Sequence, residues 1–108
     1  MSNELERLIR KIKVRIRADD PTVINDALKL AEQYPDEPGT WDVLASAYAC
    51  EDRYLEARSA LARAIAVDPQ ALLLFLRRGE YELRLENYER AIADFSQALL
   101  LSDQQNVD

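Results

Sequence analysis

The 108-residue sequence contains no histidine and only one cysteine, Cys50. Without an imidazole, the chain lacks the side chain that most often serves as a general base or metal ligand. A single cysteine can form neither an internal disulfide nor, alone, a zinc site. We therefore expect no metal and no other cofactor. The lone thiol also favours a reducing compartment, which predicts a cytoplasmic location.

Glycine-rich loops and long apolar runs are missing as well. The chain has two glycines, no glycine-rich phosphate loop and no nucleophile-elbow motif. Its longest unbroken apolar run spans residues 71–76, far short of the roughly 20 residues that cross a bilayer. Residues 1–20 alternate charged and aliphatic side chains, unlike a secretory signal. These absences predict a protein that is not an enzyme and does not enter a membrane.

Charge is distributed unevenly along the chain. The net charge is −6, but residues 1–17 carry 6 basic and 2 acidic side chains, a net charge of +4. Residues 18–108 carry the remaining 8 basic and 18 acidic side chains, a net charge of −10. An acidic body of this kind argues against nucleic acid as a ligand. The basic N-terminal segment suits an acidic partner or the acidic surface of the chain itself.

What the sequence does contain is an internal repeat, in which residues 34 positions apart match in size or aromatic character. The matched pairs are Pro35 and Pro69, Trp41 and Phe75, Ala45 and Gly79, Tyr54 and Tyr88, Ala57 and Ala91, Leu61 and Phe95, and Ala64 and Ala98. A repeat of this length is typical of stacked helical hairpins. Apolar stripes at helical spacing further predict helices over residues 3–17 and 22–34, with a break at residues 18–21.

The most specific motif is W-x2-L-A-x2-Y, formed by Trp41, Leu44, Ala45 and Tyr48. Its four residues fall on one face of a helix. The residues that follow it at set distances are Ala57, Leu61, Ala64 and Pro69. This pattern resembles the tetratricopeptide repeat, which has the same period. The resemblance implies an all-α fold of three stacked antiparallel helix hairpins, six helices in all, wound as an α-solenoid into a right-handed superhelix.

Three units make up the predicted single domain, residues 1–103. Residues 1–37 form a divergent N-terminal hairpin, residues 38–70 a well-matched unit, and residues 71–103 a third unit. In the third unit Arg78 and Glu82 stand where the motif has leucine and tyrosine, and Asp103 replaces the closing proline. We expect residues 104–108 to be a disordered tail, and we expect no seventh helix to cover the sixth.

The resemblance also implies where a ligand binds, because the first helix of each hairpin in this family lines a concave groove. The matching positions are Arg7, Arg10 and Lys13 in the first unit, Asp42, Val43, Ser46 and Ala49 in the second, and Leu73, Leu76, Arg77, Glu80, Leu83 and Arg84 in the third. They predict a cationic and aliphatic groove suited to an amphipathic segment that carries carboxylates. The competing interpretation is packing, because leucines at this spacing also form a core stripe.

One kind of ligand is not expected in this groove. Chaperone adaptors of the tetratricopeptide family hold a C-terminal carboxylate with lysine, arginine and asparagine at set groove positions. Asp42, Val43 and Ser46 stand in that part of the groove here. The resemblance therefore implies that the tails of heat-shock chaperones are not ligands of this chain.

A second candidate surface lies near the C-terminus, where apolar side chains occur on nearly every side of residues 71–85. Exposed apolar patches usually mark interfaces. The candidate oligomer or partner interface comprises Leu74, Ile92, Phe95, Leu99 and Leu100. The alternative is that a few exposed leucines are simply tolerated, as they are on many protein surfaces.

The sequence supports three kinds of function. The first is a small bacterial protein-interaction module, an adaptor or chaperone, that binds a peptide or amphipathic helix of another protein in its groove or on its C-terminal helices. The second is a self-associating structural protein, for example a homodimer. The third is an acidic inhibitor or immunity protein that covers a basic partner, which a strong salt dependence of binding would distinguish.

Overall fold

The computed structural model describes residues 3–105, and within this range the chain forms six α-helices and no strand. The helices are α1 (Asn3–Arg17), α2 (Val23–Gln33), α3 (Pro38–Cys50), α4 (Tyr54–Val67), α5 (Leu72–Arg84) and α6 (Tyr88–Gln105). The all-α prediction with six helices is confirmed. Residues 104 and 105 belong to α6, so the predicted tail starts too early, and residues 106–108 lie outside the described range.

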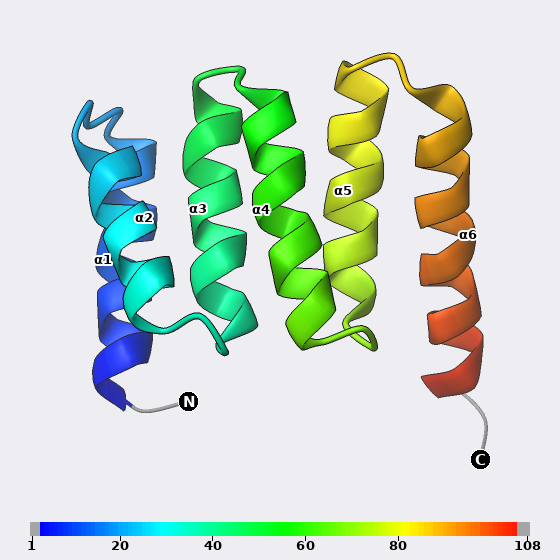
Figure 1. Cartoon of the computed structure of the whole chain (residues 1–108), viewed down its shortest axis with the longest axis horizontal. Helices are drawn as coiled ribbons and strands as arrows, with labels where there is room; N and C mark the ends of the chain where they lie inside the picture. Colours follow the sequence, from blue (N-terminus) through cyan, green and yellow to red (C-terminus); the bar gives the residue numbers. More distant parts are fainter. Residues whose placement is uncertain (1–2, 106–108) are drawn as a thin grey trace.

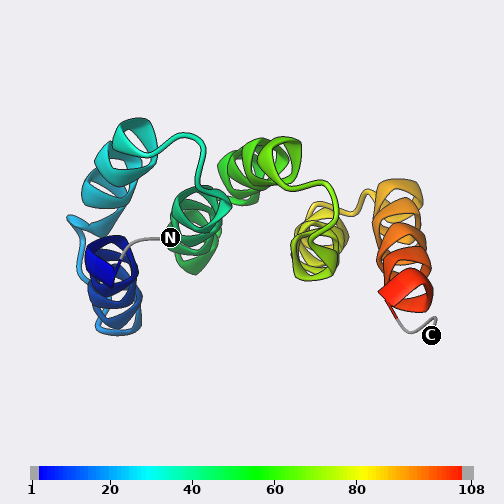
Figure 2. The same cartoon turned by 90° about the horizontal axis from the view of Figure 1, so that it is seen from below.

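The helices stand side by side and alternate in direction, so that consecutive helices form antiparallel hairpins (Figure 1). Seen along the helix axes, α1, α3 and α5 follow one side of the molecule, while α2 and α4 follow the other (Figure 2). The α1–α2 hairpin and α6 lie at opposite ends of this row (Figure 2). The molecule is therefore a flat row of helices, 38 × 34 × 21 Å in extent, with two end faces.

The turn inside each hairpin has the same geometry. Asp19, Asp52 and Glu86 adopt positive φ values of 60°, 58° and 62°. In each turn the next residue donates its N–H to a carbonyl of the preceding helix: Asp20 to Arg15 (3.1 Å), Arg53 to Tyr48 (3.0 Å) and Asn87 to Glu82 (2.8 Å). Such bonds satisfy carbonyl groups that the helix end leaves free.

These three turns give a structural alignment of the hairpins, which we call the turn alignment. Placing Asp19 on Asp52 and on Glu86 matches α1 with α3 and with α5. The first two turns are one position closer together than the last two. The first hairpin therefore departs by one residue from the strict repeat of the other two.

Small residues allow the helices to approach closely. Ala45, Ala57 and Ala64 are completely buried between α3 and α4. In the third hairpin Gly79 faces the ring of Phe95, and a Cβ added at this glycine would lie only 2.6 Å from Phe95 Cε1. The repeated small positions are therefore contacts between the two helices of a hairpin, as the sequence indicates.

The core runs along the whole stack. One apolar cluster extends from Leu5 in α1 to Leu74 and Tyr81 in α5, and a smaller cluster of Phe75, Ala98 and Leu101 joins α5 to α6. Helices inside the stack thus share their apolar faces with both neighbours. This two-sided packing decides which predicted site residues remain accessible.

Candidate functional site

The first candidate surface is formed by α3 and α5, and we call it the α3–α5 surface. Two residues predicted for the groove meet there, because the Arg77 guanidinium donates a hydrogen bond to Asp42 Oδ2. This bond raises the pKa of Arg77. The second carboxylate oxygen of Asp42 is buried and accepts no hydrogen bond. Arg77 is therefore held by the protein itself rather than being a free cation.

The α5 side of this surface presents a row of apolar side chains. Leu73 and Leu83 are 61% and 44% exposed, and Leu76 between them is half-buried. Their spacing of three and seven positions places them on one side of the helix. The α3 side of the surface contributes the small residues Ser46 and Ala49, both partly exposed. The surface can therefore take up an apolar segment without steric obstruction from α3.

One end of the surface is hollowed. Four predicted residues, Ala49, Glu80, Leu83 and Arg84, line a depression of about 320 Å³ together with Tyr54 and Tyr81. The Tyr54 and Tyr81 rings lie 5.8 Å apart, and the Arg84 guanidinium lies 6.0 Å from the Tyr54 ring. Neither tyrosine is predicted as a site residue by the sequence pattern, although the repeat of Tyr54 at Tyr88 marks one of them as structurally important.

Burial raises the pKa of the Tyr81 phenol, while a hydrogen bond with Ser46 acts in the opposite direction. Tyr81 and Ser46 thus join α5 to α3 next to the Asp42–Arg77 pair. Polar side chains of α3 and α5 therefore meet across this surface.

The basic residues of α1 are divided between two places. By the turn alignment, Arg10 and Lys13 occupy the positions of Arg77 and Glu80 on α5, and both are exposed. Arg7 instead occupies the position of Leu74, which joins the core that α5 shares with α4. The prediction that Arg10 and Lys13 extend the groove stays a prediction, whereas Arg7 belongs with the outer end of the stack.

Two predicted site residues are core residues. Val43 is 1% exposed and Leu74 is 6% exposed, so the prediction of Val43 for the groove and of Leu74 for the interface is wrong. Both side chains lie on helix faces that pack against the preceding hairpin and join the main core cluster. A one-helix pattern does not reveal this second buried face, because the helix is covered from two sides.

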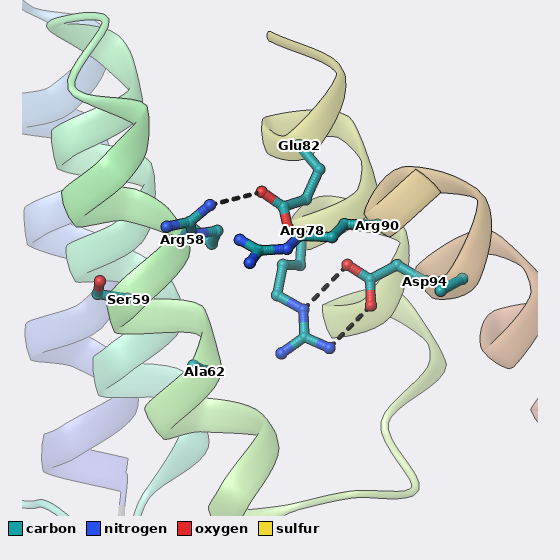
Figure 3. Close-up of a pocket in the computed structure, with 8 residues that line it drawn as sticks. Arg58, Ser59, Ala62, Arg78, Glu82, Arg90 and Asp94 are labelled. Carbon is teal, nitrogen blue, oxygen red and sulfur yellow. Dashed lines mark hydrogen bonds and ion pairs between the residues drawn. The ribbon is translucent and has the colours of Figure 1, made fainter. Parts of the chain in front are cut away.

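On the side of the molecule opposite the α3–α5 surface, the residues of the third unit that depart from the motif form ion pairs. Arg78 and Glu82, which replace leucine and tyrosine, line a cleft of about 390 Å³ between α4 and α6. Arg78 donates two hydrogen bonds to Asp94 (2.8 and 2.9 Å), and Arg58 donates one to Glu82 (3.0 Å), as Figure 3 shows. The bond to Asp94 raises the pKa of Arg78. Each buried carboxylate is thus paired with an arginine of a neighbouring helix.

The equivalent cleft one unit earlier, between α2 and α4, is apolar. Its lining includes Trp41, Leu44 and Tyr48, the motif residues of the central unit. The Arg63 guanidinium lies 4.4 Å from the centre of the Trp41 ring, a cation–π arrangement. One cleft is therefore lined mainly by apolar side chains and the next by ion pairs.

The second candidate surface is on α6. Tyr88, Ile92 and Leu99 are 59%, 64% and 64% exposed and follow one side of the helix, and we call this row the α6 stripe. Phe95, on the same side, is half-buried against Gly79, and Leu100 is 55% exposed. Four of the five predicted interface residues are thus at least partly accessible in the structure.

The described residues hold no group of acidic, cysteine and histidine side chains that could bind a metal ion. Within residues 3–105, no helix combines the length and the apolar character needed to span a bilayer.

Comparison with known proteins identifies the fold. No family model matches the sequence, and no curated protein does. Among solved structures, MamA from Desulfovibrio magneticus RS-1 matches with a TM-score of 0.88 at 17% identity, covering 97% of this chain. The second tetratricopeptide domain of Spaghetti (RPAP3), bound to the HSP90 peptide SRMEEVD, matches with a TM-score of 0.81 at 21% identity. That match covers 92% of this chain and 93% of the domain.

The tetratricopeptide domain of Sgt2 from Aspergillus fumigatus matches with a TM-score of 0.84 at 18% identity, covering 99% of this chain and 72% of that domain. The chain spans only 60% of the length of two MamA structures and 74% of a third. Similarities at these identities concern the fold, and they agree with the motif, the helix order and the close-packed small residues. The chain has the fold of a tetratricopeptide-repeat domain.

Proposed function

We propose that the chain is a protein-interaction module that holds a segment of a partner protein on the α3–α5 surface. The observation that carries this proposal is the row of exposed leucines on α5, Leu73 and Leu83, beside the small side chains of α3. Burying an exposed leucine contributes about 1.5–3 kcal/mol when it is complete, so two such contacts supply useful affinity. The tetratricopeptide domain of Spaghetti (RPAP3) is seen with a bound peptide, which supports the choice of ligand class.

The charges around the surface indicate the chemistry of the partner segment. Arg84 lies at one end of the leucine row, and the exposed Arg10 and Lys13 hold the positions of Arg77 and Glu80 on α1. Asp42 neutralises Arg77, so the free cations lie at the margins rather than at the centre. An amphipathic segment with an apolar centre and carboxylates at its ends fits this arrangement best.

The proposal includes the finer expectation of an adaptor or chaperone in a bacterial cytoplasm, without catalytic activity. In this role the leucine row shields an apolar segment of the partner. The lone exposed Cys50 is compatible with a reducing compartment.

Affinity purification of the chain from its native host, followed by mass spectrometry, tests the proposal. The wild type is compared with Leu83→Glu and with Leu55→Glu, which places the same change at a leucine of α4 that is 56% exposed and lies outside this surface. We expect Leu83→Glu to lose the bound partner and Leu55→Glu to retain it, with unchanged helix content by circular dichroism. Equal partner recovery by both variants would refute the role of this surface.

The same comparison should be made with a defined ligand, the peptide SRMEEVD. Because an aspartate and a serine, Asp42 and Ser46, face the ligand side of α3, we expect no saturable binding of this peptide in calorimetry. Specific binding weakened by Arg84→Ala would show that the chain belongs with the carboxylate-binding adaptors instead.

A further inference from the structure

The α6 stripe repeats the surface with which α4 holds α5. In the α4–α5 contact, the Tyr54 ring packs 5.8 Å from the Tyr81 ring, and Arg58 pairs with Glu82 at 3.0 Å. Ile65 completes this side of α4 by packing against the cluster of Phe75. One repeat later, these three α4 positions are Tyr88, Ile92 and Leu99, the residues of the stripe. The α6 stripe thus corresponds to a surface that holds a first helix within the stack.

One helix of the chain has an uncovered side at the corresponding place, namely α1. The turn alignment, which places Asp19 on Glu86, matches Val14 with Tyr81 and Arg17 with Arg84. These are the α5 residues whose side chains meet Tyr54. Val14 is 62% exposed and lies in a depression of about 580 Å³ that α1 lines alone, with Arg7, Arg10, Lys11 and Arg15.

The two end helices carry opposite net charge, although Arg15 is paired with Asp20 and Asp26, and Asp94 with Arg78, inside one copy. Residues 3–17 carry 6 basic and 2 acidic side chains, a net charge of +4, whereas residues 86–105 carry 1 basic and 4 acidic side chains, a net charge of −3. An α6–α6 contact would bring two acidic ends together. Contact between α1 and α6 brings opposite charges together, which favours and orients the encounter.

We propose that copies of the chain associate head to tail, with the outer side of α1 in one copy packed on the α6 stripe of the next. Val14 then packs on Tyr88 as Tyr81 packs on Tyr54, and Arg17 lies over the Tyr88 ring as Arg84 lies over Tyr54. Arg15, which takes the position of Glu82, lies beside Ile92 and covers it with its aliphatic stem. Because the contact joins two different faces, each dimer still has one free α1 side and one free α6 stripe. Assembly therefore continues beyond the dimer unless a ring forms. The α3–α5 surface remains free in this arrangement.

Two variants with one blocked end each test the proposal. Ile92→Glu with Leu99→Glu blocks α6, and Lys11→Glu with Val14→Glu blocks α1. All four side chains are exposed, so circular dichroism should show unchanged helix content. Sedimentation velocity over a dilution series measures the mass of the wild type, of each variant and of their equimolar mixture.

We expect the wild type to form species larger than a dimer that shrink as salt is raised, because screening weakens opposite-charge contact. Each blocked variant should be monomeric. Their mixture should form a one-to-one dimer and nothing larger, since it contains one intact α6 stripe and one intact α1 side. Leu55→Glu, which changes an equally exposed leucine on α4, should assemble like the wild type.

Three results would overturn the head-to-tail arrangement. If the α1-blocked variant still dimerises while the α6-blocked variant does not, α6 pairs with α6. If the mixture of the two variants stays monomeric although the wild type assembles, the contact uses other faces. A wild type that is monomeric at millimolar concentration would rule out self-association, and the α6 stripe would then bind a helix of another protein.

Discussion

Replacing Gly79 with alanine tests whether the contact between α5 and α6 in the third hairpin requires a glycine. The glycine lies inside α5, where alanine is favoured by about 1 kcal/mol on helix propensity. The new methyl group would, however, lie 2.6 Å from Phe95 Cε1 and 2.9 Å from two further ring carbons. Overpacking of this kind costs about 1–3 kcal/mol. We therefore expect Gly79→Ala to destabilise the protein by about 1 kcal/mol net.

The central hairpin offers the compensating change. There the pair corresponding to Gly79 and Phe95 is Ala45 and Leu61, and both residues are completely buried. Phe95→Leu alone should lower stability by about 1 kcal/mol, because it leaves unfilled space against the glycine. Combined with Gly79→Ala, the leucine makes room for the methyl group. The double variant should thus be more stable than the sum of the two single changes implies, with a coupling energy of about 1–2 kcal/mol.

Urea denaturation followed by circular dichroism measures all four proteins of this cycle, and thermal unfolding provides a second reading. For a domain of this size, 1 kcal/mol corresponds to a shift of about 4–8 °C in Tm. Stabilisation by Gly79→Ala alone, or a coupling energy near zero, would show that the contact with Phe95 does not require the glycine.

Two further predictions concern the ion pairs. Arg78→Ala leaves the buried Asp94 carboxylate unpaired and should destabilise the protein by about 2–4 kcal/mol, somewhat less than a fully buried pair because Arg78 is partly exposed. The double variant Arg78→Leu with Asp94→Ala carries the residues of the central unit, Leu44 and Ala60. Its free energy of unfolding should lie within about 1 kcal/mol of the wild-type value. Urea midpoints of the single and double variants distinguish the loss of an ion pair from a simple loss of side-chain volume. For Asp20, the Thr22 N–H, the Arg15 guanidinium and the Thr22 hydroxyl lower the pKa to about 2. A lowered carboxyl pKa contributes stability that is complete above its unfolded pKa and is lost as the pH falls. Between about pH 4 and pH 2 the wild type should therefore lose stability more steeply than Asp20→Asn, and parallel pH profiles would contradict this.

Much of the scaffold could be predicted from local patterns. The internal repeat and the helical spacing of residues such as Trp41 and Tyr48 require only neighbours along the chain, so they identify the helices and the hairpins. The break at residues 18–21 and the two exposed rows on α5 and α6 follow from the same periodicity. The accessibility of Leu83, Ile92 and Leu99 was predicted correctly for this reason.

The tertiary structure decided what lies between the hairpins. Val43 and Leu74 look like surface residues within one helix, but each is covered by the preceding hairpin. Arg78 and Glu82 look like departures from the motif, yet their partners Asp94 and Arg58 lie on two other helices. The turn geometry gives Arg7 the position of Leu74, so Arg7 faces the end of the stack and not the groove. A periodic sequence fixes the buried face of each helix, whereas the direction of that face depends on turn geometry and on contacts between residues distant in the chain.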